Sequence, residues 1–331
     1  MNELIFEKEE KEFLKKLKME LKGLFLSGES IAIKLHMGES KNENNLKPKF
    51  VAKIVKILKS LKTEPFIFDS VALYNPRDTI DGYKKIASKN GFTESGIGCP
   101  IVISEDFITS KINGNVFEVC KPLVDADGVL ILSHVKGHQC AGFGGAIKNL
   151  ADALTKKSKE YIHEGGKPEY IGNCNICNVC KNECPKNAIV FDQAVNIPSF
   201  DYEKCNGCSI CLYLCKIGVI KPRIDKFDKM LAMGANVALN MFKKEYFVNV
   251  LMNMAKNSDY DNEATEIVVP DIGFIMGNDV VGMDRATYDK IIERVGRDIF
   301  KEIHKKSALL HIREAERLKM GNSDYIYRVF K

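Results

Sequence analysis

Apolar positions along the first half of the chain follow two spacings. Short continuous apolar runs predict buried strands at residues 31–35, 65–69, 100–104, 116–120 and 128–133. Between and beside these runs, apolar residues recur at helical spacing and predict helices at residues 1–30, 48–61, 78–90 and 146–157. Strands that alternate with helices are typical of an α/β fold. We expect a mostly parallel sheet with helices on both faces.

A stretch of different composition interrupts this pattern. From residue 166 to residue 224, cysteine, glycine, proline and asparagine replace the regular apolar spacing. The earlier pattern then returns, with helices predicted at residues 227–239 and 284–304 and strands at 247–251, 266–269 and 272–276. We therefore predict one α/β core, formed by residues 1–165 and 225–331, with residues 166–224 inserted into it. Three domains in series remain an alternative.

Composition and charge exclude several classes of protein. The chain has 331 residues, 45% of them hydrophobic and 28% charged, which is ordinary for a globular protein. Its net charge of +5 is spread along the chain, so it favours neither a nucleic acid nor a membrane as partner. No apolar run reaches the length of a membrane span, and the N-terminus is too acidic for a signal peptide. We expect a cytoplasmic protein.

Eight of the eleven cysteines lie in one short stretch, between Cys174 and Cys215. The spacing C-x₂-C-x₂-C-x₃-C occurs there twice, which favours metal binding over disulfides. In bacterial ferredoxins, three cysteines of such a run bind one [4Fe–4S] cluster and the fourth binds the other. The predicted ligands are Cys174, Cys177, Cys180 and Cys215 for cluster A, and Cys205, Cys208, Cys211 and Cys184 for cluster B.

Other metal centres fit this spacing less well. A Cys₄ zinc site uses two separated C-x₂-C pairs rather than two uninterrupted triplets. A [3Fe–4S] form of one cluster is a lesser alternative. The two runs differ at one corner, because Lys216 stands where the first run has Pro185. A lysine beside an anionic cluster would slightly raise the reduction potential of that cluster.

A second group of reactive side chains follows the predicted strand at residues 128–133. Two histidines, two lysines and a glycine-rich turn precede a predicted helix there, an arrangement that suits an anionic ligand. We take His138, Lys136 and Lys148 as candidate catalytic residues. The ends of other strands point to the same edge of the sheet. The candidate ligand-binding residues are His36, Glu39, Asp69, His134, Gly142, Gly144, Gly145 and Asn149.

Simpler interpretations of the same residues stay open. A glycine-rich loop is often only a tight turn, and this one matches no nucleotide-binding motif. His134, His138 and Cys140 form an H-x₃-H-x-C pattern that a third metal could use. The remaining histidines, His163, His304 and His311, are expected on solvated helices or loops.

Several stretches together resemble the DUF362 family, a domain of unknown function found in Fe–S centre proteins. The resemblance rests on residues 33–39, 65–69 with 73–74, 90–92, 133–138, 142–149, the cysteine repeat, Asp271, Asp279 and Asp284. It implies a shared core that carries a two-cluster ferredoxin module. It implies no particular reaction.

Two hypotheses of function follow. In the first, the protein is a ferredoxin-dependent oxidoreductase that transfers electrons, through two [4Fe–4S] clusters, between a ferredoxin-like or other redox protein and an anionic small-molecule ligand. Lys136 and Lys148 would hold the ligand, Asn149 would position it, and His138 would donate a proton. In the second, the protein is a non-catalytic electron carrier, or a cofactor- or metal-assembly protein, that acts on a protein partner. The sequence shows no flavin, nicotinamide or radical S-adenosylmethionine motif, which weighs against the first.

Overall fold

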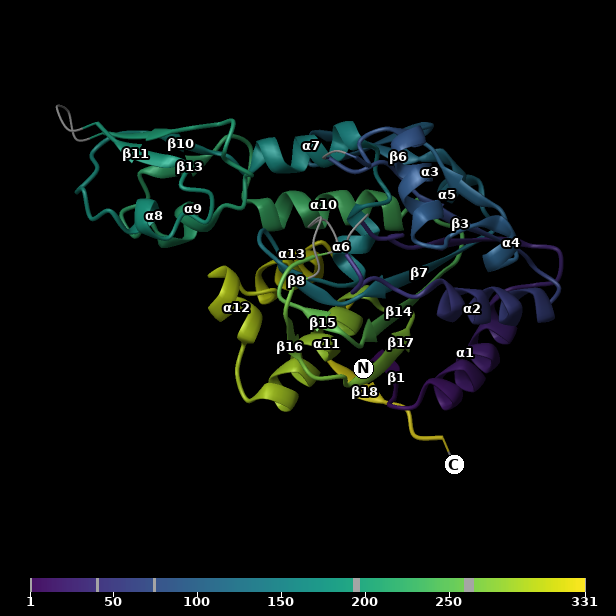
Figure 1. Ribbon diagram of the computed structural model, residues 1–331. Coiled ribbons are helices and arrows are strands. Elements are labelled where there is room, and N and C mark those ends of the chain that lie inside the picture. The colour runs from purple at the N-terminus through teal and green to yellow at the C-terminus, as the bar shows by residue number, and fades with distance from the viewer. Residues whose placement is uncertain (1, 40–41, 74–75, 193–196, 259–264, 331) are drawn as a thin grey trace.

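The computed structural model describes residues 2–39, 42–73, 76–192, 197–258 and 265–330 (Figure 1). Its centre is an eight-stranded sheet with the order β18-β1-β17-β14-β7-β2-β3-β4. The strands are β1 (Asn2–Glu7), β2 (Ser30–Lys34), β3 (Glu64–Asp69), β4 (Ile101–Ile103), β7 (Gly128–His134), β14 (Glu245–Leu251), β17 (Gly273–Gly277) and β18 (Tyr325–Tyr327). The five strands from β14 to β4 are parallel, whereas β17 is antiparallel to both of its neighbours. This large, mostly parallel sheet confirms the predicted α/β class.

Helices cover both faces of the sheet (Figure 1). One face packs against α1 (Glu10–Leu24), α2 (Pro48–Ser60), α3 (Ile80–Lys89) and α4 (Glu94–Ile97). The other packs against α5 (Lys121–Asp125), α6 (Ala146–Ala151), α7 (Lys156–Gly165), α10 (Phe227–Leu239), α11 (Val280–Val295), α12 (Ile299–His304) and α13 (Leu309–Arg317). Strand β7 is buried on both faces, which explains its continuous apolar run. No helix of the described residues combines the length and hydrophobicity needed to cross a membrane.

Two predicted helices are each split in two. The one expected at residues 146–157 is α6 followed by α7, because Thr155 caps a new helix by accepting a hydrogen bond from the Ser158 N–H. The one expected at residues 284–304 starts earlier, at the Asp279 cap, and ends at Gly296, which has φ +76°. Helix α12 follows it.

The ends of the chain add strands that the apolar pattern does not predict. Strand β1 precedes α1 inside the segment expected to be one helix, and β18 pairs with it in parallel. Strand β5 (Phe107–Ile112) pairs with β6 (Asn115–Cys120) in a hairpin outside the large sheet. Two more small sheets form near the candidate site, from β8 (Lys136–His138) with β9 (Gly142–Gly144) and from β15 (Met254–Ala255) with β16 (Ile267–Val269).

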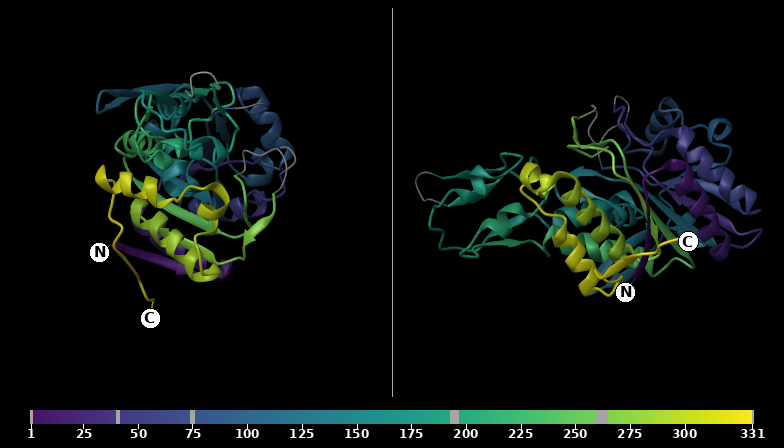
Figure 2. Two further views of the ribbon diagram at one scale, coloured as in Figure 1. Left: turned by 90° about the vertical axis from the view of Figure 1, so that its left-hand side faces the viewer. Right: turned by 90° about the horizontal axis from the view of Figure 1, so that it is seen from below.

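The cysteine-rich segment projects from one end of the core (Figures 1 and 2). It contains two two-stranded sheets, β10 (Pro168–Tyr170) with β13 (Ile220–Pro222) and β11 (Ile189–Phe191) with β12 (Pro198–Phe200), and two short helices, α8 (Val179–Asn182) and α9 (Ile210–Leu214). A small apolar cluster of its own lies inside it. The chain leaves the core after α7 and returns at α10, which packs on α6 and α7. Because β14 then pairs with β7, strands from both sides of this segment share one sheet.

Candidate functional site

The eight clustered cysteines line two separate cavities in the projecting segment. One is lined by Cys174, Cys177, Cys180 and Cys215, and the other by Cys184, Cys205, Cys208 and Cys211. The last cysteine of each run therefore lies with the first three of the opposite run. Among the described residues, no three His, Cys, Asp or Glu side chains lie close enough together to hold a single metal ion.

The backbone around the two cavities repeats at an offset of 31 residues. Helices α8 and α9 start at equivalent positions, as do strands β11 and β13. Left-handed backbone occurs at three equivalent pairs of positions, Ile176 with Gly207, Asn178 with Ser209 and Asn187 with Gly218. The cysteine repeat is thus a structural repeat, in which each half forms one turn around a cavity.

The donors in these cavities suit thiolates bound to a metal cluster. The Ile176 N–H donates to Cys174 Sγ at 3.3 Å, and the Ala188 N–H donates to Cys184 Sγ at 3.3 Å. Burial raises the pKa of the Cys208 thiol to about 11 and raises that of Cys211 as well. These residues fit the predicted [4Fe–4S] clusters, with the ligands crossed between the runs.

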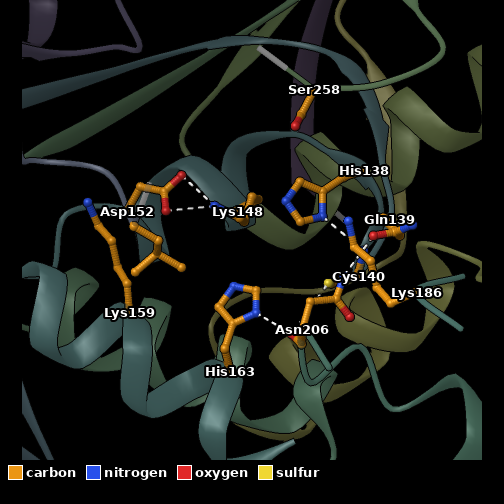
Figure 3. A pocket seen from close by; sticks show the side chains of 11 residues that line it. His138, Gln139, Cys140, Lys148, Asp152, Lys159, His163, Lys186, Asn206 and Ser258 are labelled. Carbon is orange, nitrogen blue, oxygen red and sulfur yellow. Dashed lines mark hydrogen bonds and ion pairs between the residues drawn. The ribbon is translucent and has the colours of Figure 1, made fainter. Parts of the chain in front are cut away.

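A third cavity, of about 330 Å³, lies where the projecting segment meets the core (Figure 3). We call it the junction pocket. It is lined by Leu73, His138, Gln139, Cys140, Lys148, Asp152, Lys159, His163, Lys186, Asn206 and Ser258. The core provides most of this lining, from the turn between β8 and β9 and from helices α6 and α7. Lys186 and Asn206 come from the cysteine-rich segment, and both also line the cavity of Cys184, Cys205, Cys208 and Cys211.

A smaller cavity continues from the junction pocket toward the ends of the parallel strands. The two share His138, Lys148, Asp152 and Ser258. Six further residues from the sequence prediction line the smaller one, namely His36, His134, Lys136, Gly144, Gly145 and Asn149. The structure therefore brings most of the candidate residues to one place.

Buried charges surround the floor of the junction pocket. Lys148 Nζ lies 2.6 Å from each carboxylate oxygen of Asp152, as Figure 3 shows. Burial alone would raise the pKa of Asp152, but Lys148, Lys159 and Lys34 together hold it below its usual range. Asp152 is therefore ionised. In the described lining, three lysines (Lys148, Lys159 and Lys186) accompany this single carboxylate, a balance that suits an anionic ligand.

Two histidines of the pocket are held in opposite tautomers. His138 Nδ1 accepts hydrogen bonds from the backbone N–H groups of Cys140 and Ala141, both at 3.2 Å, so a neutral ring carries its proton on Nε2. His163 Nδ1–H donates to the Asn206 carbonyl at 2.6 Å, which leaves Nε2 as the acceptor. Burial and the charge of Lys148 hold the pKa of His138 well below its usual value. The pocket thus has one neutral imidazole that donates through Nε2 and one that accepts.

Stability is expected to fall as the pH drops from about 7 toward 4. Burial lowers the pKa of His163 from 6.5 to about 4, so between these values the unfolded chain binds a proton that the folded chain does not. The folded pKa is the lower one, so the contribution is complete above pH 6.5 and is lost as the pH falls. We expect a change of about 1–3 kcal/mol from His163, measured by urea unfolding across this range. His163→Gln should flatten the profile, and an unchanged slope would contradict the assignment.

Three residues predicted to bind ligand line neither cavity and make contacts inside the core. Asp69 forms an ion pair with Lys34 at 2.7 Å and accepts a hydrogen bond from the Tyr83 hydroxyl. Glu39 pairs with the Arg77 guanidinium. The lining residues of the two cavities include neither carboxylate. Gly142, with φ +83°, packs against the backbone of residues 306–308 and lines neither cavity.

Asn149 lines the smaller cavity but connects three elements of the core. Its side-chain amide donates to the Leu132 carbonyl at 3.0 Å and to Ser133 Oγ at 3.1 Å, and its Oδ1 accepts from Lys34 Nζ at 3.0 Å. Asn149 therefore fixes α6 against β2 and β7. Its predicted role in positioning a ligand would be indirect.

The start of α6 already holds an anion from the protein itself. The backbone N–H groups of Ala146 and Ile147 donate to the Asp284 carboxylate, at 2.7 and 3.0 Å. Asp284 is fully buried, and a Cβ at Gly145 would collide with it. The glycine-rich turn was expected to offer these groups to an external anion. They bind Asp284 instead, so the lysines remain the main attraction for a ligand.

The sequence prediction was wrong about three histidines, and the residues of the H-x₃-H-x-C pattern line different cavities. His163 lines the junction pocket, while His304 and His311 are buried and donate to the carbonyls of Lys256 and Ala141, respectively. His134, from the H-x₃-H-x-C pattern, donates to the Met252 carbonyl and lines only the smaller cavity. Cys140 lines only the junction pocket. Lys159 and His163 lie four residues apart in a helix, so the sequence alone could have indicated that both side chains point to the same side of it.

Comparisons with known proteins find one family, and two relatives that match a short part of the chain. A family model described as "Domain of unknown function (DUF362)" matches residues 31–289. Two curated relatives, the RNA polymerase subunit Rpo3 of Methanosarcina acetivorans and that of Methanosarcina mazei, are each 40% identical over 52 residues. These matches cover 15% of the chain and 20% of each relative.

Two solved structures are similar over much of the chain. A structural-genomics protein from Thermotoga maritima is 11% identical, with a TM-score of 0.44, over 93% of this chain and 60% of that one. The lactate racemase apoprotein from Thermoanaerobacterium thermosaccharolyticum is 14% identical, with a TM-score of 0.35, over 76% of this chain and 50% of that one. The chain thus spans 50–60% of the length of these proteins.

Proposed function

We propose that this chain, which belongs to the DUF362 family, is an iron–sulfur oxidoreductase whose anionic substrate binds in the junction pocket. The eight cysteines would hold two [4Fe–4S] clusters, with Cys184 and Cys215 exchanged between the runs. When bound, the clusters would supply one-electron transfer. The ligand would lie beside the cluster-B cysteines.

One observation carries this proposal: the loop of the cluster-B cysteines is also a wall of the junction pocket. The Asn206 carbonyl accepts from His163, and its side-chain amide donates to Gln139 Oε1 at 2.7 Å. The Cys208 carbonyl accepts from Lys306 Nζ at 2.5 Å. Ser209 Oγ donates to the Gly166 carbonyl at 3.0 Å and accepts from the Phe227 N–H at 2.9 Å. Hydrogen bonds to Asn206, Cys208 and Ser209 therefore hold this loop at the edge of the pocket.

The charges of the pocket support an anion as the ligand. Lys148 and Lys159 are both less than one-tenth exposed, and Lys186 adds a third ammonium group from the cysteine-rich segment. Carboxylate or phosphate oxygens are the groups that such lysines bind. Lys148 already pairs with Asp152, and the two further lysines leave the lining with a net positive charge that an anion would balance.

The two imidazoles would donate protons to the ligand and accept protons from it. In Figure 3 the rings of His138 and His163 both face the pocket interior. His138 would donate through Nε2–H, and His163 would accept at Nε2. Each electron gained by the ligand would be lost by a reduced external donor, and the accompanying proton would pass through these rings. Burial by the cysteine-rich segment would limit the access of water to the pocket.

Anaerobic purification tests the proposal most directly. We expect about eight iron atoms per chain and one small anion that co-purifies. Mass spectrometry would identify the anion, and its spectrum should change after the protein is reduced with dithionite. Iron-loaded protein with an empty pocket, together with tight capture of a protein partner, would favour a non-catalytic electron carrier or assembly protein.

Inorganic phosphate provides a simple probe for the lysines of the pocket. Lys148→Ala should weaken phosphate binding by about ten-fold or more in calorimetry, because a buried ammonium group is lost. Lys186→Ala removes an exposed side chain, so it tests the same site without a risk to folding. Lys157→Ala, on the solvent side of α7 and 80% exposed, is the matched control. Equal affinity in all three variants would contradict a cationic pocket.

A further inference from the structure

An exposed apolar surface surrounds the first run of cysteines. Ile176, Val179 and Ile217 are 38%, 39% and 48% exposed, and Cys177 between them is also exposed. Val179, Ile217 and Cys177 line the cavity of the cluster-A cysteines. We call these four residues the Cys177 face.

The internal repeat shows which surface the equivalent residues contact in the other half of the segment. At an offset of 31 residues, Ile176, Cys177 and Val179 correspond to Gly207, Cys208 and Ile210, all of them buried. Gly207 packs so closely on the His163 carbonyl that a Cβ would not fit, and Ile210 belongs to the main hydrophobic core. One half therefore uses this face to dock on the core. The Cys177 face is its uncovered equivalent.

The charges around the Cys177 face are mostly positive. In residues 172–183 and 214–221 the charged side chains are Lys181, Lys216, Lys221 and Glu183; the three lysines are exposed, whereas Glu183 is half-buried. Lys216, which replaces the proline of the first run, lines the cluster-A cavity. A partner that covers this face would therefore be acidic around an apolar centre. Electrostatic attraction of this kind speeds association more than it adds affinity.

We propose that the Cys177 face is the docking site of a small acidic electron-carrier protein, which delivers electrons at the end of the segment away from the junction pocket. The inference rests on the proposed function and adds the entry point and the kind of partner. One electron leaves the reduced carrier and one is gained by this chain, with no covalent bond formed or broken. Such contacts are small and short-lived, which agrees with an apolar centre of only three side chains.

Binding of an acidic 2[4Fe–4S] ferredoxin, measured anaerobically by surface plasmon resonance, tests the inference. Lys181→Glu combined with Lys216→Glu should weaken binding by about ten-fold or more at low salt, and raising the salt concentration should weaken the wild-type complex similarly. Lys11→Glu combined with Lys22→Glu is the control, because it makes the same change in net charge on exposed positions of α1. Ile176→Asn removes the apolar contact at a left-handed position that asparagine tolerates.

The outcomes separate this inference from the proposed function. The phosphate affinity should remain that of the wild type in both double variants, since neither pair lines the junction pocket. Lys216 lines the cluster-A cavity, so the iron content of its variant is measured as well, and ferredoxin binding is compared between proteins with the same iron content. Unchanged ferredoxin binding in Lys181→Glu/Lys216→Glu would overturn the docking site and leave the pocket untouched. A dimeric wild type that Ile176→Asn converts to a monomer would also overturn it, because a second copy would then cover the face. A wild-type protein that binds no iron after anaerobic purification would instead contradict the proposed function.

Discussion

The Cys184→Ala substitution is expected to remove one of the two proposed clusters, the one assigned to the second run of cysteines. Cys184 follows the first run in the sequence, but it lines a cavity with Cys205, Cys208 and Cys211. We expect the iron content after anaerobic reconstitution to fall from about eight to about four atoms per chain. Iron analysis together with the electron paramagnetic resonance spectrum of the reduced protein measures this loss.

Double variants then decide which cysteines share a cluster. Cys184→Ala combined with Cys205→Ala should lose no more iron than either single variant, because both residues belong to one cavity. Cys184→Ala combined with Cys174→Ala should lose both clusters. The reverse pattern would show that each run binds its own cluster, against the crossed arrangement. Cys99→Ala, at a buried cysteine outside the segment, is the control and should keep all the iron.

The spacing of the cysteines was the most informative part of the sequence because it fixes local geometry. Each run forms its turn with contacts a few residues apart, and the similarity of this spacing to that of bacterial ferredoxins allowed the pairing of Cys184 with the second run to be predicted. The apolar run at residues 128–133 likewise predicted the central strand, since a parallel strand must be apolar on both faces. Both features depend on short-range patterns.

The junction pocket depends on contacts between distant parts of the chain. His163 reaches Asn206 across 43 residues, and Asp284 reaches Ala146 across 138. A helix N-terminus with free N–H groups cannot be distinguished, in the sequence, from one that a distant carboxylate already occupies. For this reason the sequence analysis named Lys148 but missed Lys159 and Lys186 of the junction pocket, and it assigned the N–H groups of the glycine-rich turn to an external ligand.

A buried ion pair holds the cluster-B loop to the core, and the second large effect is expected there. Lys306 Nζ lies 2.7 Å from Asp228 Oδ2 and also donates to the Cys208 carbonyl. The side chains of both ions are at most 1% exposed, and the Tyr213 hydroxyl donates to the same carboxylate oxygen at 2.9 Å. Lys306→Met would leave an ionised carboxylate buried without its counter-ion. We expect the free energy of unfolding to fall by about 3–5 kcal/mol, as measured by urea unfolding.

The size of this effect follows from desolvation rather than from attraction between the two charges. If so, replacing both partners should cost less than replacing one, because no charge is then left buried alone. Lys306→Met combined with Asp228→Leu should therefore recover a large part of the loss, although Tyr213 and the Cys208 carbonyl lose their partner. Lys157→Met breaks the exposed pair with Glu118 and should cost less than about 1 kcal/mol. A Lys306→Met loss as small as that of Lys157→Met would show that water solvates Asp228 in the folded protein, and that the loop is held by its backbone contacts instead.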